Sequence, residues 1–358
     1  MKYTFEISIS GCAARCAHCY VSGGAAPAVP LDGYLKAIVT LKSILDRIKG
    51  EIYVTLGNEI FTHPRVVDII TVTREIMPDY YSYHGLNGFV PTTGMALVNR
   101  KDRDKILEAL QSACCAGFML TLHGDKDNHN RITRNEQAFD AVKTAVDWVI
   151  GCGFDIKFNL MLNKSLIADW REVRAFVRDY PQAVRKLTVP LYLPTARLRN
   201  FQQYRAEYSD CLRLKGALEE IGIDENSFFR DVFDNCETSV YALLKNNGFD
   251  YAGQEAGLPD WAFFNITQSF DVFYGNAGLH TKRLGNLLDD DSDNLLRKIA
   301  ALPSNYEWSA YYDVPALPPV KDVLCDISPV DANFVYSSIH DCVYSWLDRI
   351  GVPSILIK

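Results

Sequence analysis

The chain has 358 residues, of which 48% are apolar and 23% are charged, and its formal net charge is −7. This composition is ordinary for a globular enzyme, and the length allows one large domain or one and a half. The acidic balance argues against nucleic acid as a partner, because phosphate binding needs a basic face. No stretch approaches the ~20 apolar residues of a membrane span, and the first residues lack the apolar core of a signal peptide, so we expect no membrane association and a cytoplasmic location.

The first 195 residues alternate short strand-like runs with amphipathic helical stretches, which is typical of a parallel α/β sheet. We predict six strands, at 3–9, 51–56, 88–93, 117–123, 155–162 and 186–193. We predict five helices between them, at 32–48, 64–77, 102–113, 137–150 and 168–179. Six strands are too few for a closed eight-stranded barrel, so the expected fold is α/β, an open, partial (β/α)6 parallel barrel.

After Pro194 the regular alternation stops, so we expect a core domain over 1–195 and a C-terminal α+β extension over 196–358. In the extension, apolar spacing predicts helical structure over 200–247 and two strands around a tight turn, at 261–267 and 270–274. The remaining predicted elements are a helix near 293–302, an aromatic, proline-rich loop around 306–320, a helix near 330–349 and a final strand over 354–357. No low-complexity linker separates the two parts, so the extension is expected to pack on the barrel.

Three cysteines, Cys12, Cys16 and Cys19, follow the first predicted strand. The spacing Cys-x3-Cys-x2-Cys places three thiolates in a short loop that can hold a cube-shaped iron–sulfur cluster and leave one iron open. Zinc with three thiolates and a histidine is an alternative, although His18 adjoins Cys19 and sequence neighbours rarely both reach one tetrahedral ion. Disulfides are disfavoured because the clustered thiols are odd in number, and the other cysteines are scattered without metal spacing.

This cysteine loop resembles that of the radical S-adenosylmethionine (SAM) superfamily, in which the open iron binds the amino and carboxylate groups of SAM. Later strand ends are also similar to the family, over about residues 1–195. The second, Gly57-Asn58-Glu59-Ile60, resembles a Gly-Gly-Glu-Pro segment with Asn58 and Ile60 as departures. The third, Thr92-Thr93-Gly94, resembles a Thr-Asn-Gly stretch. His123 and His129 follow the fourth strand and are either site residues or ordinary loop histidines.

The resemblance implies one [4Fe–4S] cluster, held by the three loop cysteines, and SAM bound at the strand ends. It implies SAM contacts from His18, Gly57, Asn58, Glu59, Thr93, Thr121, Arg131, Asn163 and Leu193. Among these, Glu59 would pair with the methionine ammonium, and Arg131 would hold a carboxylate through its planar fork. The implied activity is reductive cleavage of SAM, with the 5′-deoxyadenosyl radical abstracting a substrate hydrogen, and an electron donor such as flavodoxin or ferredoxin.

The predicted hairpin and the run Lys282–Leu287 resemble a SPASM or twitch extension. Gly275-Asn276 stands where the extension usually has a cysteine, and no Cys-x2-Cys group follows, so we expect no auxiliary cluster. A degenerate extension would keep the shape and lose the metals. Cys236 (or Cys325) and Tyr192 are candidate hydrogen-atom donors to a substrate radical. The alternative for the two cysteines is that each is a buried structural residue.

Extensions of this kind often accompany peptide substrates, so the first functional hypothesis is peptide modification in natural-product maturation. The alternative is a small molecule such as a sugar, an aminoglycoside or an amino-acid derivative. Only eleven residues precede Cys12, so a leader peptide would need a separate binding protein. A non-catalytic SAM- or zinc-binding module is the hypothesis from a different class.

Overall fold

A computed structural model describes residues 1–19, 23–57, 59–81, 88–190, 201–234, 261–275 and 282–302, with short pieces between 326 and 349. Its described strands form two sheets. The first has the order β2-β1-β7-β8-β9, with bounds Glu51–Gly57, Lys2–Ser8, Trp261–Ile266, Asp271–Tyr274 and Lys282–Asn286. The second is fully parallel and has the order β3-β4-β5-β6, with bounds Phe89–Thr92, Gly117–Leu122, Asp155–Met161 and Val184–Thr188.

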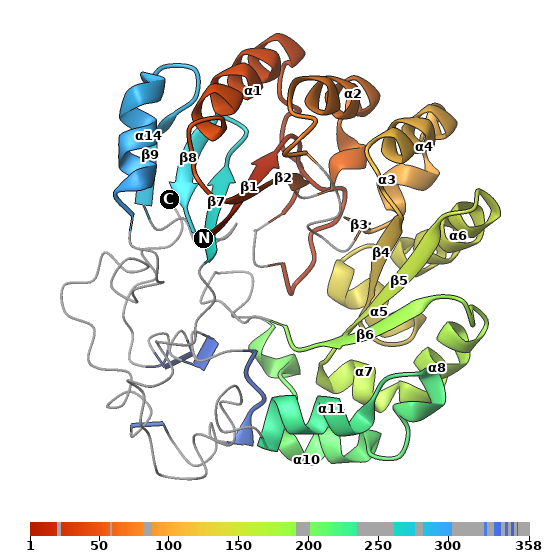
Figure 1. The fold of residues 1–358 in the computed structure, drawn as a ribbon. Helices are drawn as coiled ribbons and strands as arrows, with labels where there is room; N and C mark the ends of the chain where they lie inside the picture. Colours follow the sequence, from red (N-terminus) through yellow and green to blue (C-terminus); the bar gives the residue numbers. More distant parts are fainter. Residues whose placement is uncertain are drawn as a thin grey trace.

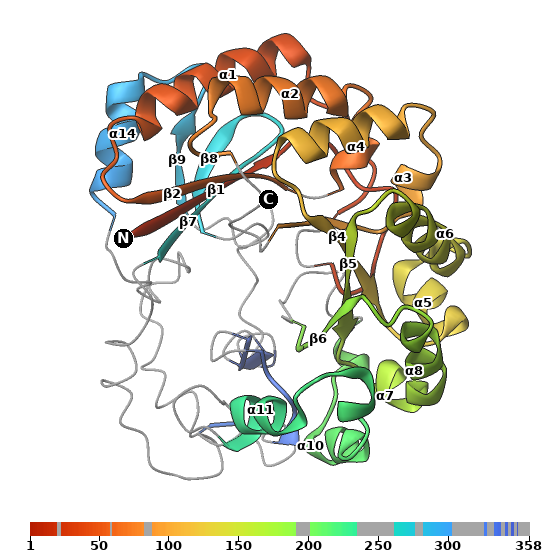
Figure 2. The same ribbon diagram turned by 45° about the vertical axis from the view of Figure 1, so that its right-hand side comes forward.

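The five predicted helices of the core are confirmed, as α1 (Leu31–Leu45), α2 (Val66–Ile76), α4 (Arg103–Ser112), α6 (Ala138–Gly151) and α8 (Trp170–Arg178). Figure 1 shows them along the outer side of an arc of strands, and the turned view in Figure 2 shows the same arrangement. Shorter segments lie at the strand ends: η1 (Ile60–Thr62), α3 (Met95–Val98), α5 (Lys126–Thr133) and α7 (Lys164–Ala168). The molecule is therefore an α/β protein with an open, barrel-like arc of strands.

Strand β1 shows why the described core helices cover the outer side of the arc. Phe5 and Ile7 are fully buried in the core beneath the helices, and Phe5 stacks on Phe264 of β7 with ring centroids 4.5 Å apart. Side chains alternate along a strand, so the intervening Glu6 and Ser8 face the inner, concave side. That side is where the candidate site lies.

The C-terminal extension joins the core through β7. This strand pairs with β1 in parallel register, Phe5 opposite Phe264 and Glu6 opposite Asn265, and so covers the edge of β1 that β2 does not. The predicted hairpin is confirmed as β7 and β8, which are antiparallel, and the helix predicted near 293–302 is α14 (Ser292–Ala300). The extension therefore packs on the barrel, while the division at residue 195 stays a prediction.

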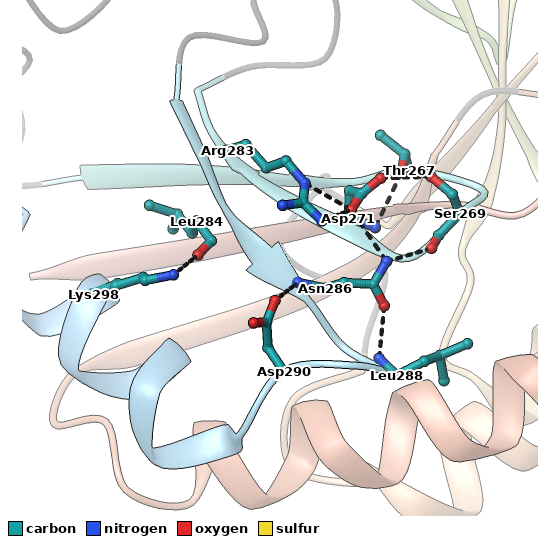
Figure 3. Close-up of polar contacts among 9 residues, drawn as sticks. All are labelled: Thr267, Ser269, Asp271, Arg283, Leu284, Asn286, Leu288, Asp290 and Lys298. Atoms are coloured by element: carbon teal, nitrogen blue, oxygen red, sulfur yellow. Dashed lines mark hydrogen bonds and ion pairs between the residues drawn. The ribbon is translucent and has the colours of Figure 1, made fainter.

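Asn286, in the sequence Leu284-Gly285-Asn286-Leu287, fastens this hairpin (Figure 3). Its side-chain amide donates to the carbonyl of Ser269, at 2.7 Å, and its side-chain oxygen accepts from the amide of Leu288, at 2.8 Å. Its own main-chain amide donates to Asp290. One buried side chain therefore ties the β7–β8 turn to the end of β9.

Residues 200–247 were expected to be helical, and the described part, 201–234, contains short helical segments. These are η3 (Gln202–Tyr204), α10 (Tyr208–Cys211), η4 (Leu212–Leu214), η5 (Glu219–Ile221), α11 (Glu225–Phe229) and the π-helical η6 (Arg230–Asp234). The predicted loop at 306–320, the strand at 354–357 and most of the helix at 330–349 lie outside the described residues. None of the helices in the described ranges combines the length and apolar content that crossing a bilayer requires.

Candidate functional site

A cavity of about 340 Å³ lies at the carboxyl ends of β1, β2, β3 and β4. Parallel α/β folds place ligands at this edge of the sheet, where the loops begin. The three loop cysteines line the cavity, together with five of the predicted SAM-contact residues: His18, Gly57, Glu59, Thr93 and Thr121. Residues far apart in the sequence therefore meet in one site.

Backbone amides face the sulfurs of the cysteine loop. The amide of Ala14 donates to Cys12 Sγ at 3.3 Å, and the amide of Gly23 donates to Cys19 Sγ at 3.1 Å. Such donors favour the thiolate form, which is the form that binds iron. All three cysteines are free of disulfides, and Cys16 is buried against α6.

The loop is held in place by close backbone contacts. The amide of Ala17 donates to the carbonyl of Ile132 in α5, at 2.7 Å, and the amide of Cys12 donates to the carbonyl of Gly24, at 2.8 Å. Gly11 is required for this turn, because a Cβ there would lie 2.2 Å from the oxygen of Gly24. The thiols are thus positioned by the fold.

Glu59 joins the two sheets across the gap between β2 and β3. One carboxylate oxygen accepts from the Thr92 hydroxyl at 2.8 Å, and the other accepts from the amide and hydroxyl of Thr93, at 2.6 and 2.7 Å. Burial raises the pKa of Glu59 above its ordinary value, and the hydrogen bonds from both threonines oppose that rise. The carboxylate is therefore fixed in the cavity wall, where its remaining lone pairs can accept from a ligand.

Three histidine rings form another part of the wall. His18 and His123 have ring centroids 4.0 Å apart, and His123 and His129 have centroids 5.5 Å apart. Burial lowers the pKa of His18 to about 3, with a further contribution from His129, and burial lowers the pKa of His129 to about 4. The pKa of His123 is well below its ordinary value for the same reason. All three rings are therefore neutral at neutral pH.

Each of these rings has a buried Nδ1 atom without a hydrogen-bond partner in the described protein. Buried polar atoms are nearly always paired, so three orphaned nitrogens beside one cavity indicate a bound polar group. His123, in the loop after β4, and His129, within α5, both line the cavity.

Thr121 belongs to a polar row on the inner side of β4, β5 and β6. The side-chain amide nitrogen of Asn159 is 3.4 Å from the Thr121 hydroxyl, and the Thr188 hydroxyl donates to the side-chain oxygen of Asn159 at 2.5 Å. The Thr121 oxygen keeps capacity for a ligand. Asn159 was not singled out from the sequence, because an asparagine inside an apolar strand carries no motif.

Glu6 is the other acidic residue of the wall, and the sequence analysis also missed it. It lies inside β1, and burial raises its pKa to about 7. Gly57 makes room for it, since a Cβ at that position would lie 2.6 Å from Glu6 Oε1. A glutamate in the middle of a strand whose other face is apolar was the available signal.

Two predicted SAM-contact residues do not line the cavity. Arg131 is exposed, donates to Asn128 and Ser165, and lies over the ring of Tyr204. Asn163 is fully buried as the N-cap of α7, where its side-chain oxygen accepts from the amides of Ser165 and Leu166. Contact of either residue with SAM stays a prediction.

Other predicted site residues, Asn58, Tyr192, Leu193, Cys236 and Cys325, lie outside the described residues. Within the described ranges, no three His, Cys, Asp or Glu side chains gather closely enough to hold a single metal ion. The donor set of the cavity, three thiols with amide donors beside two of them, fits an iron–sulfur cluster.

The fold and the thiol-lined cavity define an α/β enzyme with its site at the carboxyl ends of parallel strands. The family model described as the radical SAM superfamily matches residues 7–177, a segment that contains the three cysteines and most of the cavity wall. Residues 7–177 of the protein therefore form a radical SAM domain.

Among solved structures, the chain is similar to native anSMEcpe with bound AdoMet and Cp18Cys peptide, at 12% identity and a TM-score of 0.51, covering 97% of this chain and 96% of that one. A histidine-tagged form of anSMEcpe with bound AdoMet matches at 16% identity and a TM-score of 0.50, over 82% and 80% of the two chains. Streptococcus suis SuiB bound to precursor peptide SuiA matches at 13% identity and a TM-score of 0.49, over 94% and 75%. No curated protein matches the sequence.

Proposed function

We propose that the protein binds a single [4Fe–4S] cluster through Cys12, Cys16 and Cys19, binds SAM beside it, and modifies a peptide. The observation that carries the proposal is the shared cavity, in which the three thiols lie with the fixed carboxylate of Glu59 and the hydroxyl of Thr121. A cluster held by three thiolates keeps one iron for a ligand that the protein does not supply. Auxiliary clusters form no part of this proposal.

When bound and reduced, the cluster and SAM supply a 5′-deoxyadenosyl radical that removes a hydrogen atom from the substrate. The protein's own contribution is to bind, orient and exclude competing reactions. The amides of Ala14 and Gly23 stabilise thiolate charge, and Glu59 accepts from the ammonium of SAM. Thr121 offers its hydroxyl to the SAM carboxylate or ribose. The neutral rings of His18, His123 and His129 offer a flat, uncharged wall whose free nitrogens can pair with the cofactors.

The peptide substrate is supported by the fold. The anSMEcpe structure that matches this chain over nearly its whole length holds a peptide together with AdoMet. In this protein the extension continues the first sheet through β7, so the arc is wider than the six predicted strands alone. A wider arc encloses more of the cavity. A radical site needs enclosure, because the radical would otherwise attack other C–H bonds within reach. A flavodoxin or ferredoxin as electron donor and a separate leader-peptide-binding protein complete the proposal.

Anaerobic reconstitution with iron and sulfide tests the proposal directly. We expect about four iron atoms per chain, absorbance of a four-iron cluster, and 5′-deoxyadenosine formation on reduction with SAM. Cys16→Ala should abolish 5′-deoxyadenosine formation, whereas Cys152→Ala, at an exposed thiol, should not change it. Full activity of Cys16→Ala would disprove the assignment of the loop.

The triple alanine variant of Cys12, Cys16 and Cys19 tests the number of clusters. It should retain essentially no iron after reconstitution, since no other described cysteine lines the cavity. Substantial residual iron would show a second cluster.

A further inference from the structure

Glu6 is a carboxyl group on the inner face of the arc with no described partner. Its strand neighbours Phe5 and Ile7 point into the core beneath the helices, so Glu6 points to the opposite side, and it lines the cavity. Glu59, in the same wall, accepts three hydrogen bonds. Glu6 accepts none from the described residues, although the two carboxyl groups share one cavity.

The strands on either side of Glu6 place polar, uncharged groups next to it. Glu6 pairs in register with Thr55 of β2 and with Asn265 of β7, and paired residues of parallel strands point to the same face. Asn265 is 2% exposed, and its side-chain amide nitrogen has no partner among the described residues. The Glu6 carboxyl group, which accepts no described hydrogen bond, therefore lies on the strand next to the Asn265 amide, which donates none to the described residues.

The wall supplies no positive charge to balance a carboxylate. Among the described residues that line the cavity there is no lysine or arginine. A partly buried carboxylate without a counter-charge is costly, and desolvation accordingly raises the pKa of Glu6 to about 7. A ligand that brings its own cation removes this cost, and it forms a charge-assisted hydrogen bond.

We propose that Glu6 binds a cationic group of the substrate, a primary ammonium or a guanidinium, and so selects substrates that carry one. This inference rests on the proposed function, because it assigns the substrate class of the same cavity. Asn265 pairs with Glu6 on β7 and brings no charge to it, so the cation has to come from the ligand. A lysine- or arginine-containing peptide and an amino sugar both present such a cation.

SAM carries an ammonium as well, but a different carboxylate is placed for it. Glu59 stands at the end of β2, next to the cysteine loop, and is fixed there by Thr92 and Thr93. Glu6 belongs to β1, where it pairs with Thr55, and its carboxyl group reaches toward Gly57. Glu59 follows β2, and both of its carboxylate oxygens accept hydrogen bonds from Thr92 and Thr93. Glu6 has no such donor among the described residues, so it is the carboxyl group left for a second cation.

Calorimetric titration of the reconstituted, SAM-bound full-length enzyme tests the proposal. The probes are N-acetyl-lysinamide and glucosamine, each compared with an uncharged counterpart, N-acetyl-norleucinamide and glucose. We expect wild-type enzyme to bind at least one cationic probe tenfold or more tightly than its counterpart. Glu6→Gln should abolish this preference, and Glu6→Asp should retain part of it. Glu108→Gln, at an exposed carboxylate of α4, should behave as wild type.

If the enzyme binds N-acetyl-lysinamide more tightly than glucosamine, the cation comes from a peptide. If it binds glucosamine more tightly, the cation comes from an amino sugar. A preference for the cation that persists in Glu6→Gln would overturn the proposal. So would a Glu6→Gln enzyme that binds SAM tenfold more weakly, because Glu6 would then serve SAM. Formation of 5′-deoxyadenosine without substrate is measured on the same samples. Its absence in wild type would disprove the radical SAM function and leave the cation measurement intact.

Discussion

Glu6 and Glu59 show how the surroundings of a side chain set its role. Both carboxyl groups lie in one cavity wall, and burial raises the pKa of each. Glu59 receives three hydrogen bonds that favour its ionised form, whereas Thr55 and Asn265, the strand neighbours of Glu6, bring no charge to it. Glu59 is therefore prepared to accept from a ligand in a fixed direction, and Glu6 remains uncompensated until a ligand arrives.

The raised pKa of Glu6 predicts a pH-dependent effect of Glu6→Gln on stability. The pKa is about 7 in the folded protein and has its ordinary value of 4.5 in the unfolded chain. The folded state therefore loses stability as the pH rises from 4.5 to 7, and the loss is constant above 7. Without substrate, Glu6→Gln should be more stable than wild type at pH 8, by up to about 3 kcal/mol, and equally stable near pH 4.5.

Thermal melting of wild type, Glu6→Gln and Glu108→Gln at several pH values measures this effect. The Glu108→Gln variant, at an exposed position, should follow wild type throughout. A stabilisation by Glu6→Gln that is the same at pH 5 and pH 8 would show that ionisation of Glu6 is not its cause.

Thr93 is expected to position Glu59 for SAM. Thr93→Val removes the hydroxyl donor at 2.7 Å and leaves the main-chain donor at 2.6 Å. A typical hydrogen bond contributes about 1 kcal/mol, so the dissociation constant of SAM should rise about fivefold while the iron content is unchanged. Thr144→Val, on the exposed side of α6, is the matched control. Unaltered SAM affinity in Thr93→Val would remove Glu59 from the SAM site.

At the scale of elements, Gly285 lets β9 and α14 approach closely. A Cβ at Gly285 would lie 2.5 Å from an Asp290 carboxylate oxygen and 2.7 Å from the Leu295 side chain. Gly285→Ala should therefore lower the free energy of unfolding by about 1–3 kcal/mol, as overpacking does. Gly151→Ala is the control, since its Cβ would meet nothing within 4 Å. Equal melting temperatures for the two variants would show that the contact at Gly285 relaxes without cost.

Arg205 fastens the segment after the core to the C-terminal part of the chain. Its guanidinium donates to both carboxylate oxygens of Asp341, at 2.9 and 2.7 Å, and both side chains are almost fully buried. Further bonds go to the carbonyl of Val335 and the hydroxyl of Ser345. Lysine lacks the planar fork that makes these bonds together.

Arg205→Lys should lower the free energy of unfolding by about 3–5 kcal/mol, because it leaves a buried carboxylate poorly paired. The same substitution at Arg47, whose ion pair with Asp293 is exposed, should cost less than about 1 kcal/mol. Denaturant unfolding of the two variants compares them. A cost at Arg205 as small as at Arg47 would show that the buried pair contributes no stability.

At the scale of the whole molecule, the sequence alone predicted the helices and strands whose apolar residues recur with a regular period. The five core helices and the first five strands lie within a few residues of their predicted positions, because alternating burial leaves a clear apolar pattern. The sixth strand ends at Thr188, short of the predicted residue 193. The division of the strands into two sheets was not predictable, since strand periodicity does not state which strands pair.

The candidate site followed the same rule. The three cysteines and Glu59 carry a spacing motif, and the structure places them around one cavity. Glu6 and Asn159 carry no motif, because their importance depends on which strands lie beside them. Arg131 and Asn163 matched a family pattern in sequence, and their side chains make local contacts without lining the cavity, so their contact with SAM stays a prediction.

The pairing of β7 with β1 makes the core dependent on the extension. In the full chain, β7 covers the edge of β1, and Phe264 stacks on Phe5. A fragment over residues 1–195 would expose this edge and the Phe5 ring, and open strand edges invite association with other chains. We therefore expect the fragment to self-associate and to lack cooperative melting, as measured by analytical ultracentrifugation and near-ultraviolet circular dichroism. A monomeric fragment that melts as the full chain does would establish residues 1–195 as an independent domain, and the parallel pairing with β7 would then be dispensable for folding.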